Sequence, residues 1–143
     1  MQVSEVMSRS VASIDPNAMI RDAAKRMRDE DIGALVVMDD GQPIGMVTDR
    51  DIVVRAVAAE RELGNTAVRT AMSEGVAVCK ESDSLADAAK KMSDHKIRRL
   101  PVMDGRGKLV GVVGLADITR GEEATAAETV RQVTEPGREP RQL

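Results

Sequence analysis

The sequence predicts an α/β (α+β) fold made of two copies of one small unit. Two observations predict it. Residues 3–60 match residues 68–120 in residue type and order, and within each copy short apolar runs alternate with stretches whose apolar residues recur at helical spacing. At 143 residues the chain is long enough for one compact domain, in which two such units would share a core.

The internal repeat runs through most of the chain. The segment Val3–Ser8 matches Val68–Ser73 at its valine, methionine and final serine. Asp22–Lys25 is identical to Asp87–Lys90, and Val37–Asp39 is identical to Val102–Asp104. One inserted residue in a later turn shifts the register, so that Gly45 matches Gly111 and Asp51 matches Asp117. Agreement over this length indicates a duplication.

Each copy begins with a strand and a helix. In the first copy the apolar run Val11–Ile14 stops at Asp15-Pro16-Asn17, which is a signal for a turn and a helix start. The following helix is predicted in both copies by apolar residues at positions i, i+3, i+4 and i+7. They are Ile20, Ala23, Ala24 and Met27 in the first copy, and Leu85, Ala88, Ala89 and Met92 in the second.

Two further strands and a second helix complete each copy. Residues 34–38 and 100–103 are short apolar runs typical of buried strands. Glycine-containing turns then lead into residues 44–47 and 109–113. The unit therefore runs strand, helix, strand, hairpin, strand, helix.

The division of the chain follows from this repeat. We expect the first unit at residues 3–60, a linker at residues 61–67 around Gly64-Asn65, and the second unit at residues 68–120. The chain becomes polar after the second unit, so we expect a C-terminal tail at residues 121–143 that is partly helical or disordered.

The composition excludes several classes of function. The net charge is -3, and no block of lysine or arginine is long enough to follow a phosphate backbone, so we expect no nucleic-acid partner. No stretch approaches the roughly 20 apolar residues that cross a bilayer, and the N-terminus has no apolar leader. We therefore expect no membrane partner and a cytoplasmic protein.

Chemically reactive side chains are scarce. Cys79 is the one cysteine and His95 the one histidine, whereas structural zinc takes about four ligands. With no pair of nucleophile and base, the sequence predicts no enzyme, no metal site and no required cofactor. We expect Cys79 to be buried and His95 to lie on the surface. The methionines at repeat-matched positions are expected in the core, and they are Met27, Met38, Met92 and Met103.

Two matching corners carry the candidate chemistry. The stretch GMVTDRDI, from residue 45 to 52, returns as GVVGLADI, from residue 111 to 118. A carboxylate has two acceptor oxygens and can take both vicinal hydroxyls of a ribose, which makes Asp51 and Asp117 candidates. A hydroxyl at a strand-to-helix turn, such as that of Thr48, lies where main-chain amides and the helix dipole favour an anion.

The second corner differs from the first because Gly114 stands where the first copy has Thr48. The sequence therefore predicts two unequal sites, of which the site with Thr48 and Asp51 suits a ribose phosphate better. Helix capping is the alternative interpretation. Thr-x-x-Asp before an apolar run is typical of a capping box, and glycine is tolerated at the same N-cap position.

The duplicated unit resembles the cystathionine-β-synthase-like (CBS) domain, and the tandem resembles a CBS pair, or Bateman module. The resemblance covers about residues 3–120. It is carried by Val-Met-Ser before the first strand, Ile-Arg-Arg-Leu-Pro-Val at residues 97–102, and Gly-Met-Val-Thr-Asp-Arg-Asp-Ile at residues 45–52. It implies two units about a pseudo-twofold axis, each a small mixed β-sheet with two helices on one face, with clefts between them.

The resemblance also implies an adenine nucleotide in these clefts. In that pattern Asp51 and Asp117 hold the ribose, Thr48 lies on the phosphate side, and Gly114 marks the weaker corner. The other implied ligand contacts are Arg50, Arg98 and Arg99 for the phosphate, and Val11, Ala12, Val76, Ala77, Ile32 and Ile97 for the base. Since adjacent strand residues face opposite sides, one of the two neighbouring arginines enters a given cleft.

The expected function is that of a stand-alone regulatory module. It binds AMP, ADP, ATP or a related adenosine derivative, pairs into a homodimer, and signals to an effector protein in trans. Two other interpretations are open: a ligand-free scaffold for dimerisation, or a sensor of another ligand such as S-adenosylmethionine, NAD or a metal ion.

Overall fold

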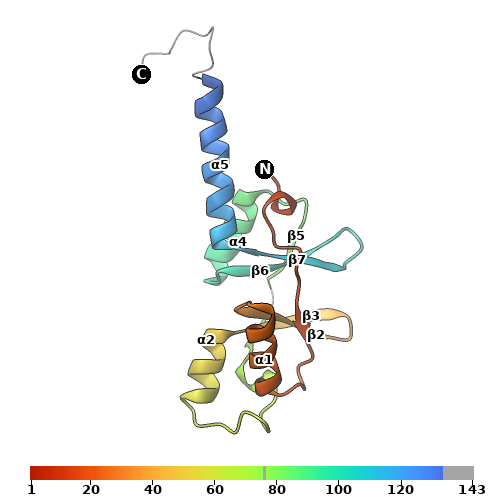
Figure 1. Ribbon diagram of the computed structural model, residues 1–143. Helices are drawn as coiled ribbons and strands as arrows, with labels where there is room; N and C mark the ends of the chain where they lie inside the picture. The colour runs from red at the N-terminus through yellow and green to blue at the C-terminus, as the bar shows by residue number, and fades with distance from the viewer. Residues whose placement is uncertain (76, 134–143) are drawn as a thin grey trace. The chain divides into compact units, whose positions relative to one another are not determined.

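The computed structural model describes residues 1–75 and 77–133 and divides into two compact units (Figure 1). The first-repeat unit consists of Ser10–Ala77. The second-repeat unit combines Met1–Arg9 with Val78–Leu143. The compact units therefore do not follow the repeat boundaries expected from the sequence, because the N-terminal residues pack with the second repeat.

The first-repeat unit contains a four-stranded mixed sheet. Its strands are β1 (Ser13–Ile14), β2 (Ala34–Asp39), β3 (Gln42–Thr48) and β4 (Ser73–Glu74), in the order β1-β2-β3-β4. β1 runs parallel to β2, and the other neighbours are antiparallel. The first strand is shorter than the apolar run Val11–Ile14 suggested, since two residues of that run pair with β2.

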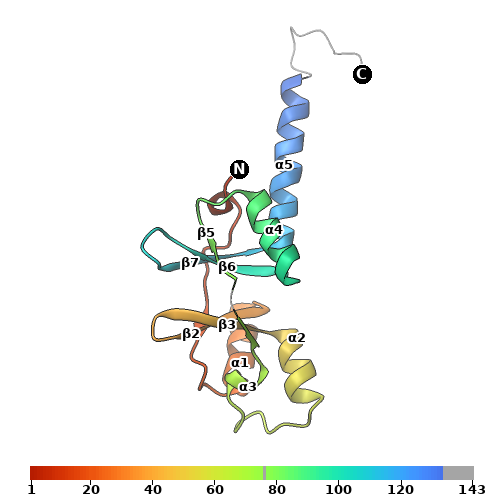
Figure 2. The same cartoon turned by 180° about the vertical axis from the view of Figure 1, so that it is seen from behind.

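Helices cover one face of this sheet, as both views show (Figures 1 and 2). They are α1 (Ile20–Glu30), α2 (Asp49–Ile52), a π-helical turn η2 (Val53–Val57) that continues α2, and α3 (Val68–Ala71). The apolar stripe that predicted α1 faces the core, where Ile20 and Ala23 are fully buried. The core is aliphatic, and Leu35, Val37, Val47 and Val68 are also fully buried in it.

The second-repeat unit repeats this plan. Its strands are β5 (Cys79–Lys80), β6 (Arg99–Met103) and β7 (Leu109–Gly114), with β5 parallel and β7 antiparallel to β6. Its helices are η1 (Val3–Glu5), α4 (Leu85–His95) and α5 (Leu115–Val133), and they also lie on one face of their sheet. The expected class, two small mixed sheets each with helices on one face, is confirmed.

Each sheet gains its last pairing from the first residues of the other repeat. Ser73 of β4 pairs with Met46 of the first repeat, and Ser8 forms an isolated antiparallel bridge with Val112 of the second. A glycine permits each approach. A Cβ at Gly45 would collide with the Ser73 carbonyl oxygen, and one at Gly111 would lie 2.8 Å from the Ser8 carbonyl oxygen. The recurring glycine of the motif therefore serves close packing of the main chain.

Several expectations about single residues can now be compared with the structure. Cys79 is fully buried and His95 is exposed at the end of α4, as predicted. Of the four core methionines, Met38 is half-buried and the other three are buried.

The beginning of the expected polar tail is a helix. α5 continues without interruption from Leu115 to Val133, and the rest of the tail, residues 134–143, lies outside the described residues. In the part of the chain that the structure describes, no helix combines the length and the apolar character needed to cross a membrane.

Candidate functional site

The first corner is a reciprocal capping box at the junction of β3 and α2. The main-chain amide of Asp51 donates to Thr48 Oγ1 at 3.1 Å, and the amide of Thr48 donates to Asp51 Oδ2 at 3.0 Å. These bonds satisfy two of the amides that a helix start leaves without helical partners. Capping, the alternative interpretation of this motif, is therefore shown for Thr48 and Asp51.

Capping uses one of the two carboxylate oxygens of Asp51. Within residues 1–75 and 77–133, no main-chain amide donates to the other oxygen, Oδ1. Its charged neighbour is Arg55, whose Nη1 lies 3.8 Å away. The Asp51 side chain is 13% exposed, so it is reachable from solvent. One carboxylate oxygen thus remains able to accept a hydroxyl while the other holds the helix start.

Arg55 links this corner to the end of α3. Its Nη1 donates to the carbonyl oxygens of Ala71 and Met72 at 3.1 and 3.0 Å, and to Ser73 Oγ at 3.3 Å. Arg55 was not among the site residues predicted from the sequence. Its position four residues after Asp51 on a predicted helix was the available signal, because side chains at i and i+4 are neighbours.

The second corner keeps the carboxylate cap without the hydroxyl. The amide of Gly114 donates to Asp117 Oδ2 at 2.7 Å. Asp117 Oδ1 accepts from Arg120, and the Asp117 side chain is 19% exposed. Gly114 has no positive φ, and a Cβ there would lie 3.4 Å from Asp117 Oδ2, an ordinary contact. Space and backbone geometry therefore do not require glycine at this position.

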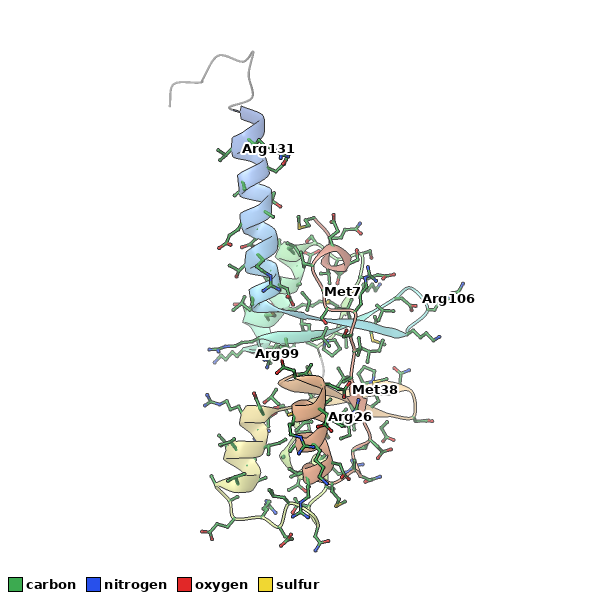
Figure 3. All side chains as sticks on the ribbon, in the orientation of Figure 1. Met7, Arg26, Met38, Arg99, Arg106 and Arg131 are labelled. Carbon is green, nitrogen blue, oxygen red and sulfur yellow. The ribbon has the colours of Figure 1, made fainter. Side chains whose placement is uncertain are left out.

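Two exposed arginines lie beside the second corner. Arg98 comes directly before β6, and Arg99, labelled in Figure 3, is the first residue of β6 and pairs with Gly114. The carbonyl of Arg98 accepts from the Leu115 amide at 2.9 Å. The matching bond in the first corner runs from the Asp49 amide to the Gly33 carbonyl at 3.0 Å, so the first corner has glycine where the second has arginine.

The remaining sequence-predicted site residues are less accessible. Arg50 is exposed on α2. Val11, Ile32, Ala77 and Ile97 are half-buried, and Val76 lies outside the described residues. Ala12 is 8% exposed and belongs to the core of the first-repeat unit. Its side chain packs in the core, so a base would contact this strand chiefly through its other residues.

The described residues offer little for metal or nucleophilic chemistry. Burial raises the pKa of the Cys79 thiol to about 11, with a smaller contribution from Asp83, so the thiol stays neutral near pH 7. In residues 1–75 and 77–133, no three His, Cys, Asp or Glu side chains come together as a metal site would need. What the corners offer is hydrogen bonding and positive charge.

Comparison with known sequences supports the repeat. The family model of the CBS domain matches residues 3–57 and 68–123. The CBS domain-containing protein YhcV of Bacillus subtilis is 40% identical over 116 residues, which are 81% of each chain.

Solved structures show the same arrangement of elements. A signal-transduction protein with CBS domains from Burkholderia ambifaria has a TM-score of 0.77 at 32% identity, over 87% of this chain and 95% of its own. The CBS domain pair of MJ0100, solved with 5′-methylthioadenosine and S-adenosyl-L-methionine, has a TM-score of 0.76 at 27% identity, over 87% and 98%. PAE2072 of Pyrobaculum aerophilum, complexed with AMP, has 0.75 at 28%, over 90% and 99%. With two matched CBS domains in tandem, the chain belongs to the CBS domain family.

Proposed function

We propose that the chain is a regulatory CBS-pair module that binds an adenosine derivative of the AMP, ADP and ATP class at the corner formed by Thr48 and Asp51. Occupancy is passed to an effector protein in trans. One observation carries the proposal: Asp51 caps a helix with Oδ2, while Oδ1 accepts no main-chain amide among the described residues and the side chain is partly exposed.

The ligands of the related structures favour adenosine as the common chemical group. AMP is bound in PAE2072, and 5′-methylthioadenosine and S-adenosyl-L-methionine are bound in MJ0100. All three carry adenine and two vicinal ribose hydroxyls. A carboxylate oxygen is a suitable acceptor for such hydroxyls, which fits the role that we propose for Asp51.

The other residues have complementary roles in this proposal. The Thr48 hydroxyl accepts from the Asp51 amide and keeps its own proton, which it can donate to a phosphate or ribose oxygen. Arg50, Arg98 and Arg99 are exposed, so they can meet phosphate oxygens with charge-assisted bonds. Asp117 serves a second, weaker site. In this proposal the half-buried residues Val11, Ile32, Ala77 and Ile97 are the candidates to contact the base.

Isothermal titration calorimetry with AMP, ADP, ATP, S-adenosylmethionine and NAD tests the proposal. At least one adenosine compound should bind, and 2′-deoxy-AMP should bind about tenfold more weakly than AMP, because a hydrogen bond to a charged group contributes about 1.5–3 kcal/mol. Asp51→Asn should weaken binding by a similar factor. Asp49→Asn is the matched control, since it removes the same charge from an exposed position of α2.

A ligand-free dimerisation scaffold is the second candidate, and a specific observation favours it. Val53, Val54 and Val57 are 57%, 52% and 53% exposed on the helix that follows Asp51. Burying the exposed half of each valine is favourable by about 1 kcal/mol, which supports a homodimer through this face. Val53→Glu with Val57→Glu should then give a monomer in analytical ultracentrifugation. If the dimer depends on these valines and no compound of the panel binds, the scaffold replaces the sensor.

A further inference from the structure

We infer that Arg55 is a positioning residue that couples ligand binding at Asp51 to the segment Ala71–Ser73. This segment precedes the junction between the two compact units, which lies after Ala77. The inference rests on the proposed function, because it assigns a route by which occupancy of that site leaves the first corner.

The contacts of one nitrogen carry the first step. Nη1 of Arg55 donates to two main-chain carbonyls and one hydroxyl of the segment, all within 3.3 Å. The same nitrogen lies 3.8 Å from Asp51 Oδ1, the oxygen that would accept the ribose. Arg55 is thus placed between the proposed ligand contact and the segment, with its positive charge attracted to both.

The segment is fixed on its other side by the sheet. α3 ends at Ala71. A helix end leaves carbonyls without helical partners, and here Arg55 donates hydrogen bonds to the carbonyls of Ala71 and Met72. Ser73 pairs with Met46 of β3, and its carbonyl packs directly on Gly45. A change in the hydrogen bonds of Arg55 therefore acts on a segment that is already held on its other side by the pairing with β3.

The direction in which binding affects Ala71–Ser73 follows from the interactions of the Arg55 guanidinium. In the free protein the Arg55 guanidinium is attracted to both the carboxylate and the carbonyls. A hydroxyl that donates to Asp51 Oδ1 takes part of the carboxylate charge, so the guanidinium interacts more strongly with the carbonyls. A ligand shifts such a balance only by interacting differently with the two arrangements, and this hydroxyl does so. Binding should therefore hold Ala71–Ser73 more tightly.

The second repeat lacks this device. Gly121 is the counterpart of Arg55, and a Cβ there would lie 2.7 Å from Leu85 Cδ1 and 2.9 Å from Val6 Cγ1. At Gly121 the helix α5 therefore packs directly on Leu85 of α4 and on Val6. Arg120 takes over the ion pair with Asp117, and its side chain is 68% exposed. In the described residues, the coupling contact is a property of the first corner.

Hydrogen exchange measured by mass spectrometry on the full chain tests the inference, with AMP and S-adenosylmethionine as separate probes. On saturation of the wild type, the peptide covering residues 69–75 should exchange at least about fivefold more slowly, the lower end of common coupling between sites. Arg55→Gln should lose this change while its Kd moves by less than about fivefold. Arg55→Lys should restore part of it, and Arg120→Gln is the matched control that leaves it intact.

The possible failures are distinguishable. If neither probe binds the wild type, the proposed function and the inference fail together. If a probe binds and the exchange of residues 69–75 is unchanged, or changes equally in Arg55→Gln, the inference alone is wrong. If Arg55→Gln loses as much affinity as Asp51→Asn, Arg55 is a ligand-binding residue and not a coupling residue. If Arg55→Gln does not fold, Arg55→Lys decides by the size of its exchange change.

Discussion

The two corners of the molecule start from the same motif and end with different chemistry. Both use one oxygen of an aspartate to cap a helix, through the amides of Thr48 and Gly114. The first corner adds a hydroxyl and an arginine that reaches another segment. The second adds two exposed arginines, Arg98 and Arg99, at the start of β6 and no hydroxyl. The duplication therefore preserved the structural bond and varied the groups that could meet a ligand.

The largest expected effect concerns a feature that the two corners share. Gly45→Ala should destabilise the fold by about 2–3 kcal/mol, because the new methyl group would collide with the carbonyl of Ser73 and overpacking costs about that much. Gly111→Ala should cost less, since its nearest atom is the flexible Met7 sulfur and the Ser8 carbonyl is 2.8 Å away. Urea unfolding measures both.

Gly105→Ala is the control for these glycine variants, because a Cβ there would have no atom within 4 Å. It should leave the free energy of unfolding nearly unchanged. Equal stability of Gly45→Ala and Gly105→Ala would show that the close approach of β4 to β3 is not a constraint on the sequence.

The sequence predicted the main strands and helices of both units and the motif at each corner, because these depend on local patterns. It did not predict the short elements η1, α3 and β4. The Thr-x-x-Asp spacing also indicated the capping box that the structure shows. The exchange of segments, by which Ser8 pairs with Val112 and Ser73 with Met46, could not be predicted. A repeat shows that two segments are alike, and it does not show which copy each of them joins.

The contacts of Arg55 could not be predicted either, because they are also long-range. They join a helix to a segment far along the chain, and no periodicity of the sequence records such a contact. The sequence alone left capping and ligand binding as alternatives for Asp51. In the structure one carboxylate oxygen caps the helix, and the other oxygen can still accept a hydroxyl, so the two roles are compatible.

The second prediction compares the two corners by removing the carboxylate of each. Asp51→Ala should weaken binding of AMP about tenfold or more, since it removes a charged acceptor, and Asp117→Ala should weaken it less. Both should lose about 1 kcal/mol of stability, because each loses a helix-start bond. Calorimetry for affinity and thermal unfolding for stability separate the two roles. Equal losses of affinity would show that the corners are equivalent sites.

The third prediction concerns a core position at which the units differ, where the first has Ile14 and the second Cys79. The folded-state pKa of Cys79 is raised from 9.0 to about 11. The proton is therefore bound more tightly in the folded state, and the contribution to stability is full below pH 9 and declines as the pH rises through 11. We expect about 2 kcal/mol less stability at pH 10.5 than at pH 8 from this group.

Cys79→Val supplies the reference for this pH dependence, because valine fills a similar volume without a titrating group. The wild type should lose stability relative to the variant over that pH range. In the native protein the buried thiol should also react slowly with a disulfide reagent at pH 8, and quickly once denaturant exposes it. Rapid reaction in the native state would contradict the burial of this residue.

The smallest expected effect tests whether the missing hydroxyl of the second corner has a structural cause. Gly114→Thr has room for its Cβ, and its hydroxyl can cap α5 as Thr48 caps α2. It should stabilise the protein by up to about 0.5 kcal/mol, because replacing glycine lowers the entropy of the unfolded chain, while threonine and glycine are similar as caps. Thr48→Gly should change stability by a few tenths of a kcal/mol and weaken AMP binding. If Gly114→Thr destabilises the protein by more than about 1 kcal/mol, packing excluded the hydroxyl. If it stabilises the protein, folding does not explain why the second corner lacks a hydroxyl.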